Sequence, residues 1–124
     1  MPYQTIGSLM INFPDHGNVT DYYRELDLGK AIITVSYKAD GVTYTRELFS
    51  SIADNVIIMR ISSSEPGKLS CNLSFNCPLE HQVSVKNKSL YLRAKGNDHE
   101  GVQGKLFDEH WLRYKQRGKI VFRL

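Results

Sequence analysis

The chain has 124 residues, of which 41% are hydrophobic, so its length and composition fit a single domain with one buried core. The formal net charge is only +3, and the basic residues are scattered, which disfavours a nucleic-acid-binding protein because such proteins gather their cations on one face. The chain shows neither a secretory leader nor the roughly 18 consecutive apolar residues of a membrane span. We therefore expect a soluble domain that binds neither nucleic acid nor a membrane, while its compartment stays open.

Residues 3–13 and 31–37 are the first two segments with strand character. The second is rich in β-branched residues, and residues 42–49 alternate between polar and apolar side chains after it. Asp40-Gly41 lies between these two runs. Because tight hairpin turns need residues that tolerate positive φ, this dipeptide predicts a two-residue hairpin.

Residues 55–61 form a nearly continuous apolar run, which predicts a central strand covered on both faces. Residues 69–80 alternate strictly, with apolar side chains at the odd positions, so they predict a strand with one buried and one exposed face. Pro78 should end its ladder because proline has no N–H donor. Cys71 and Cys77 share the apolar face and are too far apart along one strand for a disulfide, so we expect buried free thiols.

Two further hairpins are expected toward the end of the chain. The first leads from Val83 and Val85 through Asn87-Lys88 into residues 90–94. The second leads from residues 106–114 through Arg117-Gly118 into residues 120–122. Residues 107–114 are also the best helical candidate, although they fit a strand equally well.

Strands at this spacing with turns between them predict an all-β fold, an antiparallel β-sandwich that forms one domain over residues 1–124. Residues 3–13 and 119–124 show strand character almost to the two ends of the chain. Sheets cut at such points present unpaired edges, which complete domains usually cover or charge. We therefore expect an incomplete sandwich, either a fragment or a module that needs a partner surface.

Few side chains suggest a site. Asp98-His99-Glu100 lies in a glycine-containing loop where His99 and Glu100 could orient a sugar hydroxyl, although a plain polar loop explains it as well. Trp111 is the aromatic residue best suited to stack on a sugar, against a packing role. The spacing of histidine and cysteine matches no metal site, and no pair of acidic residues can be assigned to catalysis. We predict no catalytic residue, no metal and no cofactor.

A series of segments, taken in order and at their spacing, resembles the N-terminal domain of glycoside hydrolase family 95, the α-L-fucosidase family. Four of them form one block, and the other two resemble segments before and after it. They are residues 23–28, 31–37, 41–50, 55–61, 3–9 and 98–105. The resemblance covers nearly the whole chain, and its motifs are structural.

The resemblance implies an antiparallel β-supersandwich that packs against a large (α/α)6 barrel. In the family, that barrel carries the catalytic acid and the residues that activate water for inverting hydrolysis of α-L-fucosides. No catalytic residue can be carried onto this chain, so it is expected to be a non-catalytic module whose partner is the barrel. Two alternatives stay open: a stand-alone carbohydrate-binding module that takes fucosylated glycans on Trp111 or on the tyrosines, and a self-associating remnant of a truncated gene that forms a homodimer through its edge strands.

Overall fold

The computed structural model describes residues 5, 7–98, 101, 107–115 and 119–123. All ten elements in these residues are β-strands, and every pairing between them is antiparallel. The strands are β1 (Ser8–Asn12), β2 (Val19–Asp27), β3 (Ile32–Ala39), β4 (Val42–Ser51), β5 (Val56–Ser63), β6 (Asn72–Asn76), β7 (Glu80–Lys86), β8 (Ser89–Lys95), β9 (Phe107–Lys115) and β10 (Lys119–Arg123). The all-β prediction is therefore confirmed, and residues 107–115 form a strand rather than a helix.

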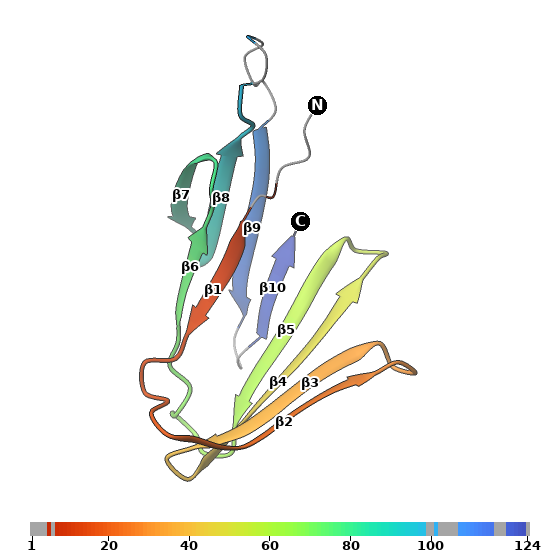
Figure 1. Ribbon diagram of the computed structural model, residues 1–124, viewed down its shortest axis with the longest axis vertical. Coiled ribbons are helices and arrows are strands. Elements are labelled where there is room, and N and C mark those ends of the chain that lie inside the picture. Colours follow the sequence, from red (N-terminus) through yellow and green to blue (C-terminus); the bar gives the residue numbers. More distant parts are fainter. Residues whose placement is uncertain (1–4, 6, 99–100, 102–106, 116–118, 124) are drawn as a thin grey trace.

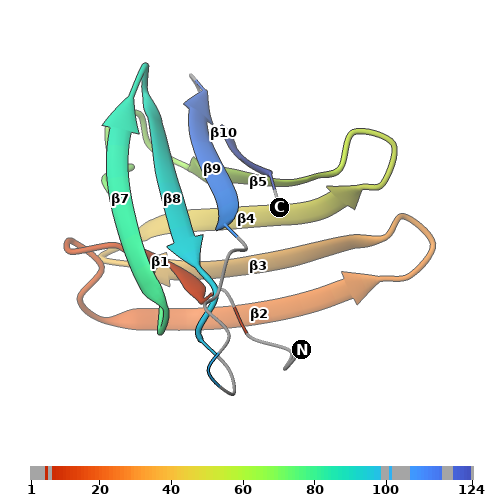
Figure 2. The same cartoon turned by 90° about the horizontal axis from the view of Figure 1, so that it is seen from above.

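The strands form two layers of unequal size. The larger is an eight-stranded sheet in the order β2-β3-β4-β5-β10-β9-β8-β7, and the smaller is the two-stranded ribbon β1-β6. The large sheet is strongly twisted, so that β2, β3 and β4 run across the direction of β7, β8 and β9 (Figures 1 and 2). The ribbon lies against one face, which we call the inner face. The antiparallel β-sandwich is thus confirmed, with one layer much smaller than the other.

The core lies between the ribbon and the middle of the large sheet. Ile61 on β5 and Leu112 on β9 are its most buried apolar side chains, at 2% and 1% exposure. Half-buried side chains from the ribbon, including Leu9 and Leu73, pack against this pair. Two smaller clusters flank it, one around Tyr37 on β3 and the other around Leu92 on β8.

The predicted alternation over residues 69–80 is confirmed. Every odd position is half-buried or buried and every even position is exposed. The strand itself is shorter than the pattern and ends at Asn76, before Pro78. Cys71 and Cys77 are both free thiols as expected, but only Cys77 is buried, while Cys71 is half-buried. Burial raises the pKa of the Cys71 thiol, which makes it less reactive at neutral pH.

Two of the three predicted hairpins have turns that lie within the described residues, and both are confirmed. Ala39 pairs with Val42 across Asp40-Gly41, whose φ angles are 50° and 83°. The second hairpin closes at Asn87-Lys88, where both φ angles are positive again, at 51° and 59°. Two successive positive φ angles identify the tight turn whose twist matches that of the flanking strands. The third predicted turn, residues 117–118, lies outside the described residues, although β9 and β10 pair as expected.

The central position predicted for residues 55–61 is also confirmed, because β5 lies between β4 and β10 in the large sheet. The prediction that both faces of this strand are covered is wrong for the outer face. Ile61 is buried on the inner face, but Ile58 on the opposite, outer face is only half-buried and Arg60 is exposed. The reason is that the β1-β6 ribbon packs on the inner face alone.

Much of the surface of the large sheet is left open. The chain exposes 9148 Å², whereas a compact monomer of its mass, 14.2 kDa, exposes roughly 6,800 Å². The edge strands β2 and β7 contribute strongly, since almost every residue in them is exposed. The buried core therefore does not extend to the edge strands β2 and β7.

Candidate functional site

The inner face carries a polar cluster centred on the hydroxyl of Tyr37. Arg46 on β4 donates a hydrogen bond from Nη2 to this oxygen at 2.7 Å, and His16 Nδ1 lies 2.8 Å from it. Tyr37 is 4% exposed, and His16 belongs to the connection between β1 and β2. The hydroxyl therefore joins this connection to the β3-β4 hairpin.

Ring contacts reinforce the same junction. The His16 ring stacks on Phe13 with centroids 4.8 Å apart and lies 3.9 Å from the ring of Tyr44. The Arg46 guanidinium is 4.4 Å from the centroid of Phe13, a favourable cation-π distance. His16 Nε2 and Arg46 Nε are buried without a hydrogen-bond partner. The cluster places one imidazole beside a cation. This arrangement holds the β1-β2 connection against the sheet and does not supply a catalytic acid and base.

The domain is expected to lose stability through His16 as the pH falls below about 6.5. Burial, and then the nearby Arg46 cation, lower the pKa of His16 from its ordinary value of 6.5, while Asp15 and Asp40 oppose the shift. The unfolded chain therefore binds a proton at a higher pH than the folded chain does, so protonation favours unfolding. Urea unfolding at about pH 7.5 and about pH 5.5 should show a smaller pH dependence in His16→Phe than in the unmodified chain. An identical dependence in both proteins would exclude this role of His16.

The outer face carries a depression of about 500 Å³ over β7, β8 and β9. Its walls include Gln82 and Ser84 from β7, Tyr91 and Arg93 from β8, and Glu109 from β9. In the described part of the chain, this is the place where an aromatic ring, an amide, a hydroxyl and both charges line one hollow. It is the best candidate for a ligand site.

Trp111, the aromatic residue singled out from the sequence, lies beside this depression rather than in its wall. It is the cross-strand partner of Tyr91, and its side chain is half-buried. The Arg113 guanidinium lies 5.4 Å from its ring centroid and donates a hydrogen bond to Ser89 Oγ at 3.2 Å. Part of the Trp111 ring is therefore engaged within the protein. His99 and Glu100, the other two predicted sugar contacts, lie outside the described residues.

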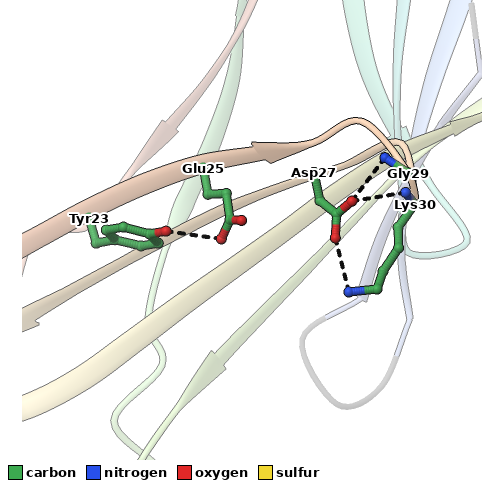
Figure 3. A network of polar contacts seen from close by, with 5 residues as sticks. All are labelled: Tyr23, Glu25, Asp27, Gly29 and Lys30. Atoms are coloured by element: carbon green, nitrogen blue, oxygen red, sulfur yellow. Dashed lines mark hydrogen bonds and ion pairs between the residues drawn. The ribbon is translucent and has the colours of Figure 1, made fainter.

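A third polar group lies at the exposed end of β2 (Figure 3). Asp27 Oδ1 accepts hydrogen bonds from the backbone N–H groups of Gly29 and Lys30, both at 3.0 Å, and its Oδ2 is 2.9 Å from Lys30 Nζ. This contact with Lys30 lowers the pKa of Asp27. Tyr23 donates a hydrogen bond to Glu25 Oε2 at 3.0 Å, which raises the pKa of the phenol. The Asp27 contacts close the β2-β3 turn, whereas the Tyr23–Glu25 hydrogen bond joins two side chains of the same edge strand.

The predictions that the chain has no metal site and no membrane span can be compared only with the described residues. Within them, no group of three or more His, Cys, Asp or Glu side chains could hold a metal ion. Nor does the described part of the chain contain a helix that could cross a membrane.

Comparison with known proteins places this architecture in a family. Residues 1–121 match the family described as glycosyl hydrolase family 65, N-terminal domain. The chain belongs to this family. The chain is also 39% identical over 98 residues to α-L-fucosidase 2 of Arabidopsis thaliana. The resemblance to a fucosidase N-terminal domain is thus confirmed, although the matching family description carries the number 65 rather than 95.

The match covers 77% of this N-terminal domain but 12% of the Arabidopsis protein. The domain therefore spans about an eighth of the length of that relative.

Several of the described carboxylates take part in ion pairs on the surface: Asp21 with Lys38, Asp27 with Lys30, Glu47 with Arg60, Glu80 with Lys95, and Glu109 with Arg93. Exposed pairs of this kind are common on protein surfaces and contribute little energy.

Proposed function

We propose that this chain is a non-catalytic β-sandwich module of a glycosidase that hydrolyses α-L-fucosides, and that its open inner face packs against the catalytic domain of that enzyme. The observation that carries the proposal is the apolar surface left uncovered at both ends of the inner face. The substrate class is suggested by the name of the Arabidopsis relative.

The uncovered surface continues the buried core outward. On β7, Val83 and Val85 stand opposite Leu92 and Leu90, so their side chains share the inner face, yet they are 42% and 77% exposed. At the other end of the sheet, Leu26 on β2 is 58% exposed. Apolar side chains that line a core face without cover mark a surface that packs against a partner.

The length of the relative supports a partner within the same enzyme. The Arabidopsis α-L-fucosidase has most of its sequence outside the matched segment. If that remaining sequence forms an (α/α)6 barrel, as the family resemblance implies, the barrel would offer a continuous surface for the inner face. The chemistry would then reside in the barrel.

Self-association through the edges is a weaker candidate. The edge strand β2 contains a bulge, because the pairing register shifts between Thr20 and Tyr23, and Asp21 in this bulge forms an ion pair with Lys38 at 2.9 Å. Bulges and charges are features by which edge strands resist pairing with a second copy.

The proposal predicts that the purified chain does not hydrolyse an aryl α-L-fucoside. The Arabidopsis α-L-fucosidase 2, assayed under the same conditions, serves as the positive control. Turnover by the pure chain that disappears in Glu109→Gln, the carboxylate in the outer depression, would show that the chain carries its own chemistry and would overturn the proposal.

A further inference from the structure

The depression on the outer face is assembled by the strand register. Ser84 pairs with Tyr91, Gln82 pairs with Arg93, and Arg93 pairs in turn with Glu109. Residues that pair across adjacent strands present their side chains on the same face, so three strands contribute to one hollow. Its volume of about 500 Å³ lies within the range of about 300–1,000 Å³ typical of small-molecule sites.

The lining favours a neutral, hydroxyl-rich ligand over an anion. Arg93 Nε lies 3.6 Å from Glu109 Oε1, so the two charges offset one another, and Lys86 is a further cation in the lining. Gln82 and Ser84 are exposed and can each donate and accept a hydrogen bond. Lys86 is thus one cation of the lining outside this pair, whereas a site built for an anion would gather several.

Tyr91 supplies the aromatic ring in the wall of the depression. Its side chain is half-buried on β8 and forms part of the wall. An aromatic ring with a hydroxyl group offers an apolar surface with a polar tip, which suits a ligand that is apolar on one side and hydroxylated at its rim. A pyranose ring has this character.

We propose that this depression binds a pyranose sugar, with Tyr91 contacting the apolar side of the ring and with Gln82, Arg93 and Glu109 hydrogen-bonding to its hydroxyl groups. The site lies on the face opposite the one proposed to pack against the catalytic domain, so the two roles are compatible. The inference that its ligand is a fucosylated oligosaccharide rests on the proposed function.

Titration of the full chain with 2′-fucosyllactose, followed by calorimetry and by NMR shifts of the backbone amides, tests the site. We expect saturable binding with shifts centred on β7 and β8. Tyr91→Ala should weaken the affinity at least roughly tenfold, a loss of about 1.4 kcal/mol. Tyr22→Ala is the matched control, because Tyr22 is 62% exposed on β2 and should leave the affinity unchanged. Far-UV circular dichroism of both variants checks that the fold is retained.

Absence of saturable binding would overturn the proposal, as would an equal loss in the two tyrosine variants. Binding of inorganic phosphate with the same amide shifts would also overturn it, in favour of an anion site at Lys86 and Arg93. Tyr91-dependent binding of lactose as tight as that of 2′-fucosyllactose would support the pyranose site but count against the fucosyl ligand. The sugar site and the non-catalytic role can therefore fail separately, because the latter is read from turnover.

Discussion

Replacing Ile61 with alanine is expected to lower the free energy of unfolding by about 2–5 kcal/mol. Ile61 is 2% exposed on the central strand β5 and packs with Leu112, which is 1% exposed. Leu9 and Leu73 from the ribbon close over this pair. Truncation would leave a cavity where the two layers meet. Because small domains are stable by only about 5–15 kcal/mol, this loss takes a large share of the total.

Urea unfolding followed by far-UV circular dichroism measures the effect. Ile52→Ala removes the same atoms from a side chain that is 94% exposed, so it should change the stability by no more than about 0.5 kcal/mol. Equal stability losses in the two variants would mean that the layers do not meet at Ile61.

Tyr37→Phe is expected to cost about 1–3 kcal/mol, although it removes a single oxygen atom. That oxygen is the shared partner of Arg46 Nη2 and His16 Nδ1. Without it, two polar groups stay in a buried site with no compensating hydrogen bond, and the unmet desolvation cost exceeds the value of an ordinary hydrogen bond.

The matched control for this substitution is Tyr22→Phe, since Tyr22 is 62% exposed and solvent can replace its hydrogen bonds. Thermal unfolding should separate the two variants clearly. If Tyr37→Phe melts together with the unmodified chain, the hydroxyl does not bridge the β1-β2 connection to the sheet.

Strand positions and turns could be predicted from the sequence because they depend on local chemistry. Asp40-Gly41 and Asn87-Lys88 adopt the positive φ angles that tight hairpins require. The alternation over residues 69–80 likewise reports a real difference in burial between the two faces. These signals can be read from residues that are close together in the sequence.

The candidate site could be predicted only in part, because it depends on the register between strands. Gln82 and Tyr91 lie on the two strands of the predicted hairpin at Asn87-Lys88, whereas Glu109 joins them only through the alignment of β9 with β8. The sequence favours Trp111 as the aromatic residue best suited to stack on a sugar, but the guanidinium of Arg113 lies over its ring. A two-residue turn at Asn87-Lys88 sets Gln82 opposite Arg93 and Ser84 opposite Tyr91, so the part of the hollow that β7 and β8 contribute follows from the sequence.

The measurement that tests the central claim most directly replaces the matching segment of Arabidopsis α-L-fucosidase 2 with this chain and assays hydrolysis of an aryl α-L-fucoside. Val85→Asp, on the uncovered inner face, should reduce the activity of the chimera at least roughly tenfold, because a carboxylate would be buried unpaired in the domain interface. Ile52→Asp, in the exposed β4-β5 turn, should leave it unchanged, and both substitutions should leave the isolated chain folded. The account would be contradicted if the unsubstituted chimera, its Val85→Asp variant and its Ile52→Asp variant were equally active. The inner face would then not be the surface that packs against the catalytic domain.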